Sequence, residues 1–271
     1  MALLIQISDP HFGTEQPPVV EALARLVQAQ APQLIILSGD ITQRARASQF
    51  RAARAFIDSL HVPALLAIPG NHDIPLFNQI ARWVRPYANY RRAFGHELEP
   101  EFDTDELLVV AVNTTRRYRH TDGEISAAQI ARVSARLAQA TPRQLRVVVT
   151  HQPVCVVRAE DACNIVRGHA AAVRQWAAAG ADLILGGHIH LPYVCALNAH
   201  DASLPRRVWA VQAGTAVSRR IRHEAGNSVN LLRYRDYGQS RQCVVERWDY
   251  TAAQQAFMLM QTHTLHCGSA L

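Results

Sequence analysis

Short runs of apolar residues, many of them β-branched, alternate along the chain with longer stretches in which apolar positions recur every three or four residues. The short runs are typical of buried strands, and the longer stretches have the period of amphipathic helices. The expected strands cover residues 3–8, 33–38, 64–68, 107–113, 146–150, 182–186 and 208–213. The expected helices cover residues 17–30, 46–60, 126–140 and 168–180. This alternation predicts an α/β fold in which helices cover a sheet.

The last quarter of the chain follows a different pattern. From about residue 208 onward, strands and turns continue without clear helices. We expect this part to form a second sheet or to complete the first one. Because no linker, repeat or composition shift divides the chain, the prediction is a single domain over residues 1–271 with a strand-rich part at about 208–271.

Composition narrows the class of protein. Of 271 residues, 49% are apolar, which is ample for one large core. No apolar run reaches the roughly 18 residues that span a bilayer, and the first nine residues have the pattern of a strand rather than of a signal peptide. The sequence therefore predicts a cytoplasmic protein without a membrane span.

Charge and cysteine content add two weaker indications. The formal charge is +6, which leaves nucleic acid open as a partner, but all the basic residues are arginine, so an arginine run is as well explained by a solvated surface. The five cysteines are scattered and form no CxxC motif. This argues against a disulfide framework or a zinc knot, and Cys155 in particular is expected to be a small buried thiol.

Side chains that bind metals follow five of the expected strands. They are Asp9, His11, Asp40, Asn71, His151, His188 and His190. In open α/β sheets, ligands bind beyond the carboxyl ends of the strands, so we expect all seven at one edge of the sheet. Residues two apart in extended backbone point to the same side, and glycines before three of the seven allow close backbone approach. The pattern predicts a site for two cations that would act as a clamp in phosphoryl chemistry.

The order of these motifs, Asp-x-His, Gly-Asp, Gly-Asn-His-Asp, His and Gly-His-x-His, resembles the calcineurin-like metallophosphoesterase superfamily. Within it, "GNHD" and "GHIH" look most like the bacterial class III cyclic-nucleotide phosphodiesterases. The resemblance implies a four-layer α/β/β/α sandwich of two packed mixed sheets with flanking helices. It also implies two metal ions from the group Mn, Fe, Zn and Co. The first would be held by Asp9, His11, Asp40 and His190, and the second by Asp40, Asn71, His151 and His188.

Two further residues receive catalytic roles through the resemblance. His72 is expected to point into the cleft and to donate to the phosphate or to the leaving alkoxide. Asp73 is expected to orient and charge His72, or alternatively to cap the helix that follows it. Arg116 and Arg117 are loose candidates for substrate contacts, and an ordinary surface role is an equal alternative.

The expected function is metal-dependent hydrolysis of phosphodiesters, with 3′,5′-cyclic nucleotides among the candidate substrates, by attack of a hydroxide that bridges the two cations. Other enzymes of the same superfamily remain open, namely a phosphomonoesterase, a nucleotide-lipid pyrophosphatase or a nuclease. The lipid-A-pathway pyrophosphatases carry arginine where this chain has His72, which counts against that alternative. A non-catalytic metal-binding scaffold is the remaining one, although such relatives tend to lose ligands that this chain retains. The oligomeric state, the metal and the natural substrate are not determined by the sequence.

Overall fold

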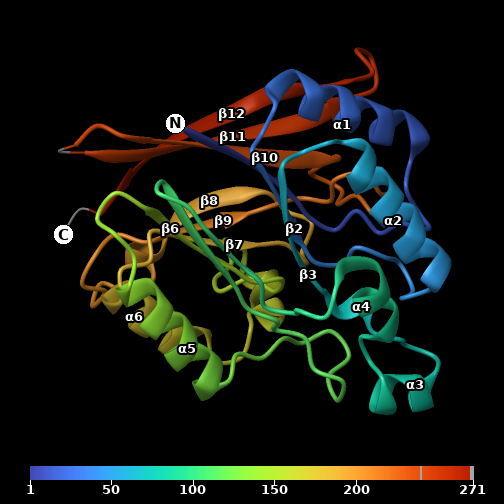
Figure 1. The fold of residues 1–271 in the computed structure, drawn as a ribbon, viewed down its shortest axis with the longest axis horizontal. Coiled ribbons are helices and arrows are strands. Elements are labelled where there is room, and N and C mark those ends of the chain that lie inside the picture. The colour runs from blue at the N-terminus through green and yellow to red at the C-terminus, as the bar shows by residue number, and fades with distance from the viewer. Residues whose placement is uncertain (239, 269–271) are drawn as a thin grey trace.

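The structure is a computed structural model that describes residues 1–238 and 240–268. In this part of the chain, two six-stranded mixed sheets pack face to face, and helices cover the outer face of each sheet (Figure 1). The first sheet has the order β12-β11-β10-β1-β2-β3. Its strands are β1 (Ala2–Ile7), β2 (Leu34–Ser38), β3 (Ala64–Ile68), β10 (Ser228–Asp236), β11 (Arg241–Thr251) and β12 (Ala256–Cys267).

The second sheet has the order β4-β5-β6-β7-β9-β8. Its strands are β4 (Glu101–Asp103), β5 (Leu107–Ala111), β6 (Leu145–Val149), β7 (Leu183–Gly186), β8 (Tyr193–Ala196) and β9 (Trp209–Gln212). The strands β1, β2 and β3 are parallel to one another, as are β5, β6, β7 and β9. The remaining strands, β10, β11 and β12 in the first sheet and β4 and β8 in the second, are paired antiparallel within their own sheet.

Helices lie on both outer faces. Their bounds are α1 (Pro17–Gln30), α2 (Ala47–Ser59), α3 (Gln79–Val84), α4 (Ala88–Phe94), α5 (Ala127–Ala138) and α6 (His169–Ala178). The helices α1, α2 and α4 pack on the first sheet, and α5 and α6 pack on the second (Figure 1). The short helix α3 lies at one end of the molecule, away from both sheets (Figure 1).

The alternation of side chains along each strand produces the layers. In β1, Leu3 and Ile5 pack with the helices outside the first sheet, whereas Leu4 joins the apolar layer between the two sheets. A third apolar layer lies between the second sheet and its helices, and it includes Val110 and Trp176. Successive residues of a strand point to opposite faces, so strands that are apolar throughout must be covered on both sides. The predicted four-layer α/β/β/α sandwich is therefore confirmed.

The predicted elements differ from the observed ones in one important respect. The helix expected at 17–30 matches α1, and each expected strand overlaps an observed strand with ends that differ by at most two residues. In the final part of the chain, β9 to β12 follow one another without an intervening α-helix among its described residues. The expectation that all metal-binding residues follow strands of one sheet is wrong. They follow β1, β2 and β3 of the first sheet and β6 and β7 of the second.

No helix in the described part of the chain is both long enough and apolar enough to cross a membrane.

Candidate metal centre

The seven side chains predicted to bind metals meet where the carboxyl ends of strands from the two sheets come together. We call this group the metal cluster: Asp9, His11, Asp40, Asn71, His151, His188 and His190. Direct contacts join the two sheets at this point. The backbone N–H of His188 donates to Asp9 Oδ2 at 2.9 Å, and His151 Nδ1 donates to the carbonyl of Ser38 at 2.9 Å.

One half of the metal cluster contains Asp9, His11 and His190, whose ligand atoms all lie within 4.8 Å of one another. His11 Nε2 is 3.1 Å from His190 Nε2, and His190 Nε2 is 3.3 Å from Asp9 Oδ1. Asp40 Oδ2 lies 3.8 Å from His11 Nε2. Asp9, His11 and His190 therefore surround one common point, and Asp40 lies beside them next to His11.

The other half contains Asp40, His151 and His188, again with ligand atoms within 4.8 Å of one another. His151 Nε2 lies 3.3 Å from Asp40 Oδ1 and 3.2 Å from Asn71 Oδ1. Asp40 thus reaches one half with each of its carboxylate oxygens. A carboxylate in this position is the group that would bridge two cations.

The backbone at the metal cluster is in an unusual conformation. Among the described residues other than glycine, five members of the cluster have positive φ angles: Asp9 (50°), His11 (43°), Asp40 (47°), His188 (73°) and His190 (56°). The left-handed region costs free energy for residues with a side chain and persists where the surrounding structure enforces it, which is common at functional sites. Five such positions in one cluster are an indication of a functional site.

Close approach of the backbones explains the glycine in the Gly-Asn-His-Asp motif. A Cβ atom on Gly70 would lie 2.1 Å from the backbone nitrogen of Asp40 and 2.2 Å from Asp40 Oδ1. No side chain fits this position without moving Asp40. The glycine therefore brings Asn71 next to the shared carboxylate.

The hydrogen-bonding pattern of the metal cluster leaves acceptor atoms turned toward each other. His151 Nδ1 and His190 Nδ1 both donate to backbone carbonyls, those of Ser38 and Arg220. In the neutral imidazole the Nε2 atoms then carry lone pairs, yet they face the oxygen atoms of Asp40 and Asp9. In addition, Asp9 Oδ1 and the Nδ1 atoms of His11 and His188 are buried without a hydrogen-bond partner. Metal ions between these side chains would satisfy Asp9 Oδ1 and the lone pairs on Nε2 of His151 and His190, so the donor set fits the two cations that the sequence predicts.

The electrostatics of the metal cluster favour the ligating forms of Asp40, His11 and His188 but the protonated form of His151. Burial opposes ionisation of Asp40, but the charge of His151 beside it holds the pKa of this carboxyl well below its usual range. Burial lowers the pKa of His11 to about 3 and that of His188 to about 4, so both rings are neutral at pH 7. Burial acts in the same direction on His151, but the Asp40 carboxylate raises the pKa of this ring to about 9. A proton on His151 and a cation beside Asp40 would therefore compete for the same place.

His72 is half-buried beside the metal cluster, with its ring centroid 4.9 Å from that of His11. Its Nδ1 donates to the carbonyl of Gln43 at 3.0 Å, and its Nε2 lies 2.9 Å from Nη1 of Arg220. Arg220 is a candidate that sequence analysis did not name individually, although it lies in an arginine-rich stretch, "SRRIRH". Its backbone carbonyl also orients His190, so this residue contacts both the cluster and His72.

The sequence predicts a contact between Asp73 and the ring of His72, but in the structure the Asp73 carboxylate has other partners. The carboxylate of Asp73 accepts from the backbone N–H groups of Gly70, Ile41 and Thr42 at 2.8–2.9 Å, and also from the Thr42 hydroxyl. Gln43 takes the orienting role instead. The alternative, a helix cap, is not observed either, since α3 begins at Gln79 with Asn78 as its cap. Asp73 fastens the loop after β3 to the loop after β2.

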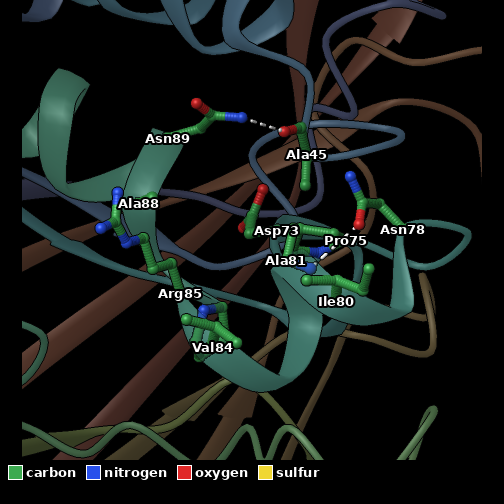
Figure 2. Close-up of a pocket in the computed structure, with 11 residues that line it drawn as sticks. Ala45, Asp73, Pro75, Asn78, Ile80, Ala81, Val84, Arg85, Ala88 and Asn89 are labelled. Atoms are coloured by element: carbon green, nitrogen blue, oxygen red, sulfur yellow. Dashed lines mark hydrogen bonds between the residues drawn. The ribbon is translucent and has the colours of Figure 1, made fainter.

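A cavity of about 500 Å³ lies on another side of Asp73, between the loop after β3 and the helices α3 and α4 (Figure 2). It is lined mainly by apolar side chains such as Ile80 and Val84, and none of the seven residues of the metal cluster lines it. Burial and the charge of Asp40 raise the pKa of Asp73 to about 7, despite the hydrogen bonds from Gly70, Ile41 and Thr42. This cavity is separate from the cluster.

Arg116 and Arg117 make contacts within their own surroundings. The guanidinium of Arg116 donates to the carbonyls of Asn113 and Thr115 and to the side chain of Gln129. Arg117 donates to the carbonyl of Trp83 and lies over its ring. These contacts hold the loop after β5 in place, and they favour the surface role over substrate binding.

A four-layer sandwich with a cluster of Asp, Asn and His side chains at its strand ends defines the class of dinuclear metal-binding hydrolases. The model of the calcineurin-like phosphoesterase family matches residues 3–192, a span that contains the whole metal cluster. The chain belongs to this family, and a metal-dependent phosphoester hydrolase is the activity that membership implies.

Individual relatives are distant. A UDP-2,3-diacylglucosamine pyrophosphatase, LpxG, of Chlamydia trachomatis is 25% identical over 43% of this chain and 43% of its own length. The glycerophosphodiester phosphodiesterase GpdQ of Enterobacter lignolyticus is 25% identical over 62% of this chain and 63% of its own. A probable cyclic nucleotide phosphodiesterase of Synechococcus is 24% identical over 70% of this chain and 74% of its own. The chain thus spans less than two thirds of the first two relatives.

Solved structures support the fold. A dimetal phosphatase from Danio rerio superposes with a TM-score of 0.67 at 14% identity, over 98% of this chain and 99% of its own. The purple acid phosphatase PPD1 from yellow lupin superposes with a TM-score of 0.72 at 11% identity, over 98% of this chain and 53% of its own. At such low identity the likeness concerns the fold alone.

Proposed function

We propose that this chain is a phosphodiesterase that acts with two metal ions in the metal cluster. Asp9, His11, Asp40 and His190 would hold the first cation, and Asp40, Asn71, His151 and His188 the second. The observation that carries this proposal is the position of Asp40, whose two oxygens face the acceptor atoms of both halves. When bound, the cations would activate a water molecule and neutralise charge on the phosphoryl oxygens.

His72 and Arg220 would act on the substrate beside the metal cluster. The Arg220 guanidinium provides charged donors for a phosphate oxygen, which is a favoured pairing for arginine. In the structure His72 donates through Nδ1 to Gln43 and faces Arg220 with Nε2. When a phosphate draws the guanidinium away, Nε2 is free to take a proton from solvent, and it would pass that proton to the departing alkoxide. We therefore propose Arg220, in place of Arg116 and Arg117, as the arginine that contacts the substrate.

A small phosphodiester is the proposed substrate class, with 3′,5′-cyclic nucleotides among its members. Two of the relatives described above are named as phosphodiesterases, one for glycerophosphodiesters and one, marked as probable, for cyclic nucleotides. The sequence motifs "GNHD" and "GHIH" point in the same direction. The relative named as a pyrophosphatase matches a shorter part of this chain, which gives that alternative less support.

The test compares metal-stripped protein with protein refilled with Mn²⁺ on bis(p-nitrophenyl) phosphate, p-nitrophenyl phosphate and 3′,5′-cyclic AMP. We expect metal-dependent turnover of the diester and the cyclic nucleotide. Turnover of the monoester alone would replace the proposal with a phosphomonoesterase. Two bound metals without turnover of any of the three would contradict the small-diester proposal and favour a bulkier substrate.

Two variants separate the roles of the residues beside the cluster. His72→Ala is expected to keep its metal and to lose about 10²- to 10⁴-fold in kcat, the usual contribution of a general acid. Arg220→Ala is expected to raise KM by about 10- to 100-fold, because one charge-assisted hydrogen bond is lost. Arg117→Ala, which removes an exposed arginine held by Trp83, is the matched control and should behave as wild type. Equal effects of Arg220→Ala and Arg117→Ala would remove Arg220 from the site.

A further inference from the structure

A second group of side chains that bind metals lies outside the metal cluster. The Sγ atoms of Cys155 and Cys195 are 3.2 Å apart, and a ring nitrogen of His200 lies within 4.8 Å of both. Cys155 belongs to the segment after β6, Cys195 belongs to β8, and His200 directly follows the short 3-10 turn Leu197–Ala199. We call these three residues the thiol site.

We propose that Cys155, Cys195 and His200 bind a thiophilic cation of the Zn²⁺ type. Two thiolates and an imidazole are a donor set that zinc prefers, whereas the metal cluster offers oxygen and nitrogen atoms only. Two sulfur atoms bound to one zinc ion at about 2.3 Å in tetrahedral geometry lie about 3.8 Å apart, so the thiols, now 3.2 Å apart, need to separate by about 0.6 Å. Each thiol releases its proton to solvent as its bond to the cation forms.

A route from solvent reaches the thiol site. A cavity of about 320 Å³ is lined by Cys155 and His200 together with His169 and Asp201. Cys155 is buried, Cys195 is half-buried and His200 is exposed, so the cation would enter from the side of His200 and reach the sulfur atoms behind it. The cavity also leaves room for a water molecule as the fourth ligand, which zinc accepts when the protein provides three.

The hydrogen bond between the two thiols shifts their pKa values in opposite directions. The contact with Cys155 lowers the pKa of the Cys195 thiol, and the same contact together with burial raises the pKa of Cys155. Cys195 is thus the thiol that loses its proton first, and it is also the more accessible of the two. The Tyr193 hydroxyl donates to the carbonyl of Cys155 at 2.6 Å and holds the backbone of Cys155 against β8.

A cation bound at the thiol site would link two segments of the fold, because of where its ligands lie in the chain. Cys155 follows His151 by four residues, and Cys195 follows His190 by five. A cation at the thiol site would therefore join the two segments that leave the metal cluster from the second sheet. Because the thiol site has its own ligands, this inference stands whether or not the proposed phosphodiesterase activity is found.

The experiment titrates Co²⁺ into metal-free, fully reduced protein. A thiolate bound to Co²⁺ gives an intense near-ultraviolet charge-transfer absorption that oxygen and nitrogen ligands do not give. We expect this absorption in the wild type and in Cys163→Ser, which removes an exposed cysteine outside the thiol site. It should be lost in Cys195→Ser and weakened in His200→Ala, and addition of Zn²⁺ should displace it.

The His200→Ala variant changes an exposed side chain, so a folding defect is not expected to obscure the result. No charge-transfer absorption in the reduced wild type would overturn the proposal, as would an absorption that persists in Cys195→Ser. If the thiols of Cys155 and Cys195 become resistant to alkylation in air while the reduced protein binds no Co²⁺ through sulfur, the pair is a disulfide and the proposal is wrong.

Discussion

The metal cluster and the thiol site are two groups of ligating side chains that the fold prepares in different ways. In the metal cluster, five of the seven residues adopt positive φ angles, and the carboxylates and two of the histidines are fully buried. In the thiol site, none of the three residues has a positive φ angle, and one side chain is exposed. The metal cluster is thus built in advance at a cost in folding free energy, whereas the thiol site can adjust when an ion binds.

The largest expected effect concerns the residue shared by both halves of the metal cluster. Asp40→Asn keeps the size of the side chain but removes the charge that faces His11 and His151. We expect loss of both cations and turnover at background level, measured by metal analysis and by hydrolysis of bis(p-nitrophenyl) phosphate. Circular dichroism serves as the folding control. Two bound equivalents in a folded variant would show that Asp40 is not the bridging ligand.

A smaller effect tests whether close backbone approach prepares the metal cluster. Gly70→Ala places a methyl group against the backbone nitrogen of Asp40, and we expect it to lower the free energy of unfolding by about 1–3 kcal/mol and to weaken metal binding. The matched control is Gly226→Ala, because a Cβ atom at Gly226 meets nothing within 4 Å. Urea denaturation of both variants checks the prediction. If the two variants have the same stability and metal content, the approach of the loops is not required.

The smallest effect belongs to the thiol site. Cys195→Ser is expected to leave turnover of the small diester close to that of the wild type, since the residue touches no member of the metal cluster in the described contacts. Steady-state kinetics in the presence of Mn²⁺ provide the measurement. A loss as large as that of a cluster variant would erase the distinction between the two sites.

The residues of the metal cluster could be predicted from the sequence because each of them follows a strand that the apolar pattern already indicates. Their burial on strained backbone could not be predicted, since that depends on the second sheet. Arg220 was not named because 148 residues separate it from His72, and only the fold brings the two together. The contact between Cys155 and Cys195, which are 40 residues apart, is hidden in the same way, although Cys155 is the buried thiol that the sequence predicts.

The role of Asp73 and the helices α3 and α4 show where local patterns mislead. Asp73 is adjacent to His72 in sequence, yet its carboxylate turns toward the loop after β2.

The helices α3 and α4 are short, Pro86 lies between them, and Ile80 and Val84 on α3 are exposed rather than buried. Because α3 lacks a buried apolar stripe, it leaves no periodic signal, and the apolar pattern predicts no helix there.

The central claim is that seven side chains hold two cations that share Asp40, and the most direct test is the metal content and electron paramagnetic resonance of Mn²⁺-loaded protein. We expect two equivalents of manganese with the exchange-coupled spectrum of ions that share a ligand. Asn71→Ala should lose the second equivalent and give the spectrum of an isolated ion. A single equivalent in the wild type, two uncoupled ions, or two equivalents retained in Asn71→Ala would contradict the account.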